Sequence, residues 1–456
     1  MRERLVVIGG DAAGMSTASQ ARRRKGPDEL EIIAFERGRF TSYSSCGIPY
    51  LTGGTVTDVG RLVVRTPEQF AEKQSIDARI RHEVISVDAA GGAVTVRDLE
   101  RGTEEQVAFD HLMIATGAVQ SLLPLPGADS EGIFGVQTLD DGIEIIRELD
   151  ERKPSRAVVV GGGYIGLEMA EAMTLRGLHV TLVESAAQPM SATLDSDMGA
   201  LVADAMRSMG IDVLTEEPAS GFEASSGRVT AVVTDDRTLP ADIVILGLGS
   251  RPNAALAETA GIALGESGGI RVNERMETTA ERVWAAGDCA EKRDRLTSKG
   301  VSIALGTHAN KEGRVAGINI TGGNEHFPGV IGTAVTKVCD LEIGRTGLKE
   351  DKAEAAGFDV MSVTVDSVTR AGYFPGKEPI KVKMIFERDG GRLLGAQILG
   401  RESAAKRIDV CATAIWSEMS VQDVMEMDLS YAPPFSPLWD PVSIAARKAV
   451  ERLGDA

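Results

Sequence analysis

Short apolar runs alternate with glycine-rich turns along the first third of the chain. The run at residues 4–8 ends at the turn Gly9–Gly14, an Ala/Ser/Arg-rich segment continues to about Lys25, and a second apolar run covers residues 30–36. This order predicts a strand, a glycine turn, a helix and a second strand. Nucleotide-binding units need these parts because the turn and the helix N-terminus hold a pyrophosphate and the terminal acid, Glu36, binds ribose hydroxyls.

The first turn departs from the GxGxxG pattern because Asp11 occupies the second glycine position. A tight structural turn without a ligand is therefore the alternative interpretation. On the nucleotide-binding interpretation, the turn residues that bind the cofactor are Gly9, Asp11, Ala12 and Gly14.

The same pattern occurs a second time and is complete. Residues 156–160 form an apolar run before Gly161–Gly166, and residues 179–184 form a strand that ends in Glu184. Two such units predict two dinucleotides bound face to face. No arginine follows Glu184 directly, so we expect NADH rather than NADPH, because a carboxylate repels a 2′-phosphate. The expected nucleotide-binding residues are Gly161, Gly163, Gly166 and Glu184.

The remainder of the chain predicts a third domain. Apolar strands are expected at residues 112–117, 242–253 and 283–290. The first two end in glycine turns, and the third ends at an acid, Asp288. A helix is expected to begin within residues 304–314. From about residue 328 the pattern is first strand-like and then helical. The sequence therefore predicts an α/β fold with two Rossmann-like domains and a C-terminal α+β domain. We expect the first nucleotide-binding domain to comprise residues 1–120 and 248–325. The second should comprise residues 121–247, and the C-terminal domain residues 326–456.

Composition narrows the class of protein. With 456 residues the chain is too long for one core, and its net charge of −18 disfavours nucleic acid and anionic membranes as partners. No apolar run reaches the roughly 18 residues that span a bilayer, and the N-terminus enters a strand without a signal-peptide pattern. Four scattered cysteines form neither a disulfide framework nor a metal-binding spacing. A cytoplasmic enzyme without a metal is expected.

Cys46 is the candidate for covalent chemistry. It lies in the segment 41–54 after the first nucleotide-binding unit, followed by Gly47 and Pro49. A cysteine that opens a helix meets the helix dipole, which stabilises a nucleophilic thiolate. A small buried apolar cysteine is the alternative.

Taken together, these motifs resemble the FAD-dependent pyridine nucleotide–disulfide oxidoreductases along essentially the whole chain. The chain is most similar to the single-cysteine branch of CoA-disulfide reductases, NADH oxidases and NADH peroxidases, and within it to CoA-disulfide reductase. The resemblance implies homodimers in which the C-terminal dimerisation domain caps the active site of the other subunit. The stretches that carry it are Gly9–Gly14, Ser42–Gly54, Ala115–Gly117, Gly161–Glu168, Gly287–Asp288 and Tyr431–Ser436.

The resemblance also implies roles for individual residues. Glu36 is expected at the FAD adenosine ribose and Asp288 at the ribityl chain, with Thr116, Gly117 and Gly287 in the same cofactor site. Tyr164 is expected to cover the nicotinamide pocket, with Glu168 nearby.

For the cysteine, the resemblance implies a partner-assisted site. Tyr373 and Tyr431 match tyrosines that reach Cys46 of the other subunit, although ordinary interface aromatics are the alternative. Ser45 replaces the asparagine common in CoA-disulfide reductases. Leu51 stands where two-cysteine members have a second cysteine, so Cys46 must cycle as a mixed disulfide, a persulfide or a sulfenic acid.

A CoA-like ligand is expected near the first helix, although a solvated helix face is the alternative. The expected substrate residues are Ser16, Gln20, Arg23, Ser42 and His308. The predicted function is NADH-driven, FAD-dependent reduction of a small-molecule disulfide or persulfide, namely CoA disulfide, CoA persulfide or polysulfide. An oxidase or peroxidase that uses a Cys46 sulfenic acid is the first rival, although 9–14 lacks the histidine those enzymes carry. The other rivals are a flavin electron-transfer partner of an iron–sulfur protein and a redox sensor.

Overall fold

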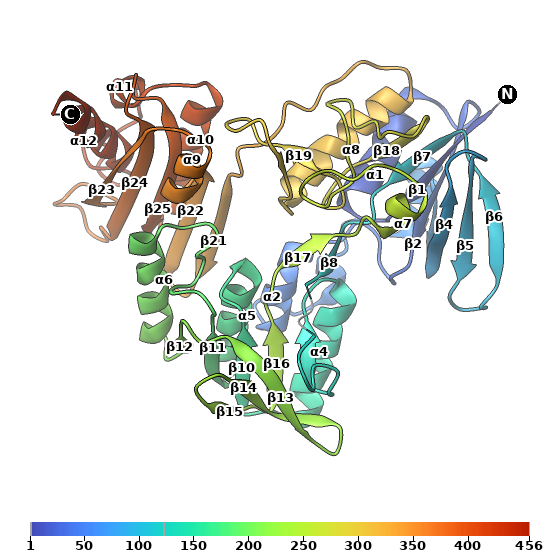
Figure 1. Cartoon of the computed structure of the whole chain (residues 1–456), viewed down its shortest axis with the longest axis horizontal. Helices are drawn as coiled ribbons and strands as arrows, with labels where there is room; N and C mark the ends of the chain where they lie inside the picture. Colours follow the sequence, from blue (N-terminus) through green and yellow to red (C-terminus); the bar gives the residue numbers. More distant parts are fainter. Residues whose placement is uncertain (1, 122–123, 456) are drawn as a thin grey trace. The chain divides into compact units, whose positions relative to one another are not determined.

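The computed structural model describes residues 2–121 and 124–455, and the chain forms two compact units. The first unit comprises residues 1–122, 135–152 and 249–330, and the second comprises 123–134, 153–248 and 331–456. Figure 1 labels many of their helices and strands.

A parallel five-stranded sheet forms the centre of the first unit, with strand order β18-β7-β1-β2-β3. Leu5, Val6 and Val7 of β1 are completely buried, as expected for a parallel sheet covered on both faces. Its strands are β1 (Glu3–Ile8), β2 (Leu30–Glu36), β3 (Asp77–Ile80), β7 (His111–Ile114) and β18 (Val283–Ala285).

Two helices, α1 (Ala12–Arg24) and α8 (Gly306–Ile320), pack closely against each other beside this sheet (Figure 1). A Cβ atom at Gly313 would lie 2.4 Å from the Ala13 carbonyl oxygen, and one at Gly317 would lie 2.6 Å from that of Thr17. Glycine is therefore required at both positions because the two backbones approach so closely.

The smaller elements of the first unit surround this core. They comprise an antiparallel sheet, two strand pairs, four helices and two 3-10 turns. These are β4 (His82–Asp88), β5 (Ala93–Asp98) and β6 (Glu104–Ala108); β8 (Ala118–Gln120) with β17 (Ser250–Pro252); β19 (Lys292–Arg293) with β20 (Gly300–Val301); α2 (Ile48–Thr52), α3 (Pro67–Gln74), α4 (Leu139–Arg152) and α7 (Ala255–Thr259); η1 (Ser45–Gly47) and η2 (Val59–Arg61).

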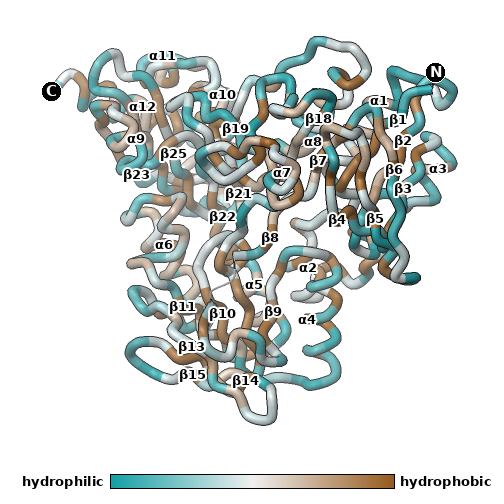
Figure 2. Tube along the Cα trace, turned by 45° about the vertical axis from the view of Figure 1, so that its right-hand side comes forward, coloured by the Kyte–Doolittle hydropathy of each residue, from teal (hydrophilic) through white to brown (hydrophobic). Residues whose placement is uncertain are grey.

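The second unit begins with another parallel sheet, in which β12, β11, β10 and β16 lie in that order. Hydrophobic stretches run along the buried strands (Figure 2). The elements of this part are β9 (Ile133–Gly135), β10 (Arg156–Val160), β11 (His179–Val183), β12 (Asp212–Leu214), β13 (Ala219–Ser225), β14 (Arg228–Thr234), β15 (Thr238–Pro240), β16 (Ile243–Leu246), α5 (Tyr164–Leu175) and α6 (Ser196–Ser208).

The C-terminal part of the second unit is an antiparallel sheet with strand order β21-β22-β25-β24-β23. All eight residues of β25 (Leu393–Gly400) are buried, so this strand lies at the centre of the core. The other elements are β21 (Ala334–Val338), β22 (Leu341–Gly347), β23 (Val360–Val368), β24 (Pro379–Glu387), α9 (Glu350–Ala355), η3 (Ala405–Arg407), α10 (Ile408–Trp416), α11 (Val421–Met425) and α12 (Pro441–Gly454).

The predicted fold class, with two Rossmann-like parts and a C-terminal α+β part, is confirmed. The contact pattern places residues 135–152 in the first unit, although the sequence assigned them to the nicotinamide-binding segment. The three domain boundaries therefore stay a prediction. Among the described residues, no helix combines the length and hydropathy needed to cross a bilayer.

Candidate functional site

The first glycine turn has the backbone geometry of a phosphate-binding loop. Gly9 has φ +109°, and a Cβ atom there would lie 2.1 Å from the Ala115 carbonyl oxygen. A Cβ atom at Gly14 would lie 2.0 Å from the carbonyl oxygen of Gly9. Only glycine permits this close approach of turn, helix and neighbouring strand.

Glu36, at the end of β2, is held beside this turn. Its Oε2 accepts a 2.8 Å hydrogen bond from the Gly10 amide, and its Oε1 accepts a 2.7 Å bond from the Gly38 amide. A pocket of about 420 Å³ adjoins Glu36 and is also lined by Arg39, Tyr43 and Arg81. This pocket has the size and polarity for the nucleoside end of a dinucleotide.

Two carboxyl groups in the same unit lack partners for buried oxygen atoms. Asp11 Oδ1 and Asp288 Oδ1 are buried and accept no hydrogen bond. Burial, together with the charge of Glu36, raises the pKa of Asp11 to about 7. Burial also raises the pKa of Asp288, against the opposing charge of Lys292. Unpartnered acceptors of this kind fit the hydroxyl and N–H groups of a dinucleotide, so the predicted FAD residues suit that cofactor.

Thr116 and Gly117 lie where the chain leaves β7. Thr116 Oγ1 donates a 2.6 Å hydrogen bond to the backbone carbonyl oxygen of Asn253. In return, the side-chain amide of Asn253 donates a 3.3 Å hydrogen bond to the backbone carbonyl oxygen of Thr116. Gly117 has φ +69°, which favours glycine. Asn253 was not predicted as part of the site, although it ends the segment 242–253, in which the sequence predicted an apolar strand and a turn.

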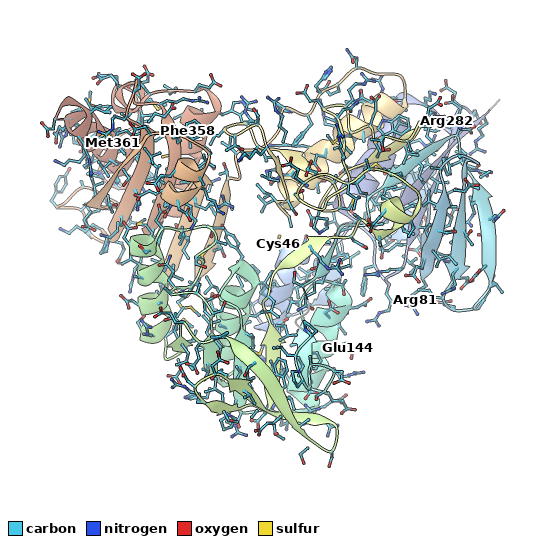
Figure 3. All side chains as sticks on the ribbon, viewed as in Figure 1. Cys46, Arg81, Glu144, Arg282, Phe358 and Met361 are labelled. Atoms are coloured by element: carbon cyan, nitrogen blue, oxygen red, sulfur yellow. The ribbon has the colours of Figure 1, made fainter. Side chains whose placement is uncertain are left out.

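Cys46 lies in the exposed turn η1 (Figure 3). The segment before it is fixed by two contacts of Ser42, whose amide donates 2.8 Å to the carbonyl oxygen of Gly10 and whose carbonyl oxygen accepts 2.8 Å from Val64. The cysteine is therefore anchored close to the first glycine turn. The alternative of a small buried cysteine is wrong, because Cys46 is exposed.

The expected helix after Cys46 is short. It is α2, with five residues, and Cys46 precedes it in a 3-10 turn with the exposed Ser45. A helix of this length has a small dipole, so the dipole argument for the thiolate is weaker than the sequence suggested.

The other three cysteines are unsuited to thiolate chemistry. Cys289, Cys339 and Cys411 are all buried. Burial raises the pKa of Cys289, and it raises those of Cys339 and Cys411 to about 12. Of the four cysteines, all of which lie in the described part of the chain, only Cys46 is exposed.

A second pocket, of about 330 Å³, brings together four of the five predicted substrate residues, Ser16, Gln20, Arg23 and Ser42. We call it the arginine pocket because Arg23, Arg65 and Arg314 all line it. The fifth predicted residue, His308, is buried on α8 and does not line this pocket.

Arg65, Asn310 and Arg314 were missed by the sequence reasoning. Asn310 and Arg314 lie one turn apart on α8, which packs on α1, and Ser16 of α1 donates 2.6 Å to Asn310 Oδ1. The four-residue spacing of Asn310 and Arg314, which places both on one helix face, could have indicated that they belong to one site. The pairing of α1 with α8 across almost 300 residues was not visible in the local pattern.

The second glycine turn, in the second unit, repeats the geometry of the first. Gly161 has φ +101°, and a Cβ atom at Gly166 would lie 1.9 Å from its carbonyl oxygen. A Cβ atom at Gly163 would lie 4.0 Å from its nearest neighbour, the carbonyl oxygen of Gly247. That side of the turn is therefore open to a ligand. Glu184 Oε2 accepts a 2.7 Å hydrogen bond from the Gly162 amide, which places the acid beside the turn as for Glu36.

Tyr164 and Glu168 lie one turn apart on α5 and face the β21–β22 hairpin. Thr336 Oγ1 donates a 2.6 Å hydrogen bond to Glu168 Oε1, and Arg345 Nε donates to Tyr164 Oη at 3.4 Å. Burial raises the pKa of Glu168, and the Thr336 hydrogen bond opposes this rise.

Tyr373 and Tyr431 lie together on the C-terminal part of the chain. Slight desolvation and the hydrogen bond with the Tyr373 hydroxyl both raise the pKa of Tyr431. Both tyrosines are exposed, Tyr373 at 78%, and other large exposed side chains in this part of the chain are Phe435, Leu438 and Trp439. No cluster of potential metal ligands occurs among the described residues.

Family models match both parts of the chain. The model for pyridine nucleotide-disulphide oxidoreductases matches residues 3–313, and that for the dimerisation domain of the same family matches residues 333–441. Members of this family use FAD and a nicotinamide nucleotide.

Three curated relatives each match nearly the whole chain. The NAD(P)H coenzyme A polysulfide/persulfide reductase of Pyrococcus horikoshii is 38% identical over 98% of both chains. A protein named NADH oxidase from Methanocaldococcus jannaschii is 36% identical over 99% of this chain and 100% of its own. A coenzyme A disulfide reductase of Staphylococcus haemolyticus is 30% identical over 98% of this chain and 99% of its own.

Solved structures of similar proteins have nearly the same fold. One of them is the NAD-dependent persulfide reductase from A. fulgidus, with a TM-score of 0.96 and 37% identity, over 99% of this chain and 84% of that chain.

Proposed function

Because the chain belongs to the pyridine nucleotide-disulphide oxidoreductase family, we propose that it uses NADH and FAD to reduce a sulfur–sulfur bond of a CoA-bearing substrate at Cys46. Of the three candidates, CoA disulfide, CoA persulfide and polysulfide, the arginine pocket favours the two that bear CoA. The arginine pocket carries this proposal. When bound, FAD supplies the transfer of two electrons from NADH to sulfur.

The arginine pocket suits CoA because of its charge. Arg23, Arg65 and Arg314 line it in a chain whose net charge is −18. CoA carries a pyrophosphate and a 3′-phosphate, and guanidinium groups bind such groups by paired hydrogen bonds. Neither oxygen nor hydrogen peroxide would need three arginines.

The pocket and the cysteine share one backbone segment. Ser42 lines the arginine pocket and is four residues before Cys46. Ser42 has φ 48° and is fixed by hydrogen bonds to Gly10 and Val64. A ligand whose phosphates lie against the arginines is thereby directed toward the loop of the thiol.

The chemistry at Cys46 is a thiol–disulfide exchange. The Cys46 thiolate attacks one sulfur of R–S–S–R′, so that a Cys46–S–S–R bond forms and R′S⁻ leaves with a proton from water. Two electrons and a further proton then return Cys46 to the thiolate and release RSH. The balance is RSSR′ + NADH + H⁺ → RSH + R′SH + NAD⁺.

Assembly forms the second part of the proposal. The dimerisation model matches residues 333–441, and the exposed tyrosines 373 and 431 lie within that range. We infer a homodimer in which these tyrosines serve Cys46 of the second copy, where a hydroxyl can donate a proton or a hydrogen bond to the leaving thiolate.

An NADH oxidase or peroxidase is the second candidate, favoured by the relative named NADH oxidase. The two reactions differ in their products. Disulfide reduction releases two thiols for each NADH and consumes no oxygen, whereas oxidase turnover consumes oxygen without releasing thiol.

The test measures both products with CoA disulfide and with a small disulfide that lacks phosphates. The proposal predicts two thiols for each NADH and a preference for CoA disulfide, and the Arg23→Gln/Arg65→Gln variant should lose that preference about tenfold, or about 1.4 kcal/mol. Arg24→Gln is the matched control, because Arg24 lies on the same helix, donates to Thr321 and does not line the pocket. Oxygen consumption without thiol release would contradict the proposal.

A further inference from the structure

Lys292 and Glu312 form an ion pair that is completely enclosed in the first unit. Their side chains are 0% and 1% exposed, and Lys292 Nζ lies 3.7 Å from Glu312 Oε1. Lys292 begins β19, whereas Glu312 lies in the middle of α8. Burial of two charges is costly, and apolar residues of similar volume often stabilise a core equally well. Neither residue has a role in the function proposed above.

The pair binds both backbone polar groups of Gly287. Lys292 Nζ donates 2.8 Å to the Gly287 carbonyl oxygen and 3.1 Å to that of Ala290. Glu312 Oε2 accepts a 2.8 Å hydrogen bond from the Gly287 amide. An ammonium group can serve two carbonyl oxygens at once, and a carboxylate on the other side accepts the amide. The turn from Gly287 to Ala290 is thus held from both sides.

This turn carries Asp288, which follows Gly287 directly. Gly287 has φ +82°, and a Cβ atom there would lie 2.9 Å from that of Ala13 on α1. Asp288 Oδ1 is buried and has no hydrogen-bond partner. A carboxyl oxygen left open in this way has to be aimed by its backbone, because no side chain orients it.

We propose that Lys292 and Glu312 are positioning residues that fix the Gly287 turn, aim Asp288 at the ribityl hydroxyls of FAD and thereby retain the flavin. The inference rests on the proposed flavin site. Lys292 and Glu312 act through the backbone of Gly287, so their effect is on cofactor retention and on the flavin's reduction potential.

The test compares full-length purified proteins by their FAD content, the rate of FAD release on dilution measured by flavin fluorescence, and the flavin reduction potential. Lys292→Met should release FAD at least tenfold faster than the parent and shift the potential. Glu312→Gln keeps an oxygen acceptor for the Gly287 amide, so its effect should be smaller. The double variant Lys292→Met/Glu312→Met replaces the pair by apolar side chains and should recover the thermal midpoint of the parent but not its slow FAD release.

Lys383→Met is the matched control. Lys383 is also a buried lysine in ion pairs, with Asp195, Asp197 and Glu350, but it belongs to the second unit. This variant should lower the thermal midpoint and release FAD at the parent rate. The positioning role would be overturned if Lys292→Met released FAD at the parent rate and kept the parent's flavin potential. It would also be overturned if the double variant recovered both the thermal midpoint and the slow FAD release of the parent. A parent protein purified without FAD and unable to bind it would instead overturn the proposed function.

Discussion

Thr336 on β21 donates a 2.6 Å hydrogen bond to Glu168 on α5, and this bond joins the C-terminal sheet to the helix that begins at the second glycine turn. Thr336 is 8% exposed, and burial raises the pKa of Glu168. The Thr336 hydrogen bond therefore favours the charged form of Glu168, which burial disfavours. The helix that begins with Tyr164 is held in place by residues of the C-terminal part.

Thr336→Val should destabilise the protein in a pH-dependent manner. When folding raises the pKa of an acid, the folded protein favours the protonated acid. The free energy of unfolding then falls as the pH rises from the pKa of the acid in the unfolded chain to its pKa in the folded protein. The valine variant removes the bond that favours the carboxylate, so its loss of stability, about 1–3 kcal/mol, should be larger at pH 8 than at pH 5. Denaturant midpoints at both pH values test this, with Thr336→Ser as the control that retains the hydroxyl. An equal loss for valine at both pH values would show that Glu168 does not depend on this bond.

Glu184 should select NADH over NADPH. Its carboxylate is fixed by the Gly162 amide at 2.7 Å and the Ala186 amide at 2.8 Å, so it cannot turn away from a 2′-phosphate without losing both bonds. We expect kcat/KM to favour NADH in the parent and the preference to shrink in Glu184→Gln, by about 1.4 kcal/mol for each tenfold change. A parent that prefers NADPH would refute this assignment.

The tyrosine pair should act in the second copy of a dimer. The Tyr373→Phe/Tyr431→Phe variant should bind FAD normally and turn over disulfide more slowly, because a positioned proton donor typically contributes about 10²–10⁴-fold. Mixing this variant with Cys46→Ser chains provides the decisive comparison. If the tyrosines act in trans, each mixed dimer has one site with both defects and one intact site, so activity returns. Mixed dimers that form and stay inactive would argue against action in trans.

The two nucleotide-binding units were predictable from the sequence because their determinants are local. A glycine turn, a helix and a terminal acid lie within about 30 residues, and the structure places both Glu36 and Glu184 against a turn amide as the pattern requires. Cys46 was singled out from its segment as the candidate for covalent chemistry, and it is exposed, although α2 proved to be only five residues long.

Other features depend on contacts between distant segments and were not predictable. The arginine pocket needs Arg314 of α8 beside Arg23 of α1, and Glu168 needs Thr336, 168 residues away. The buried pair of Lys292 and Glu312 looked like two ordinary charged residues, because a sequence pattern does not reveal which charges the packing of α8 encloses. The periodicity of apolar residues in a helix or strand indicates which of its faces is buried, but it does not indicate which other element packs against that face.

The most direct test of the account is the sulfur chemistry of Cys46 itself. The parent and Cys46→Ser proteins, both loaded with FAD, are incubated with CoA disulfide, analysed by intact mass and then supplied with NADH. The account predicts one CoA adduct on Cys46 of the parent that disappears when NADH is added, with thiol released in step. The serine variant should retain FAD but form no adduct and lose disulfide reduction. Disulfide reduction at the parent rate by Cys46→Ser would contradict the central claim.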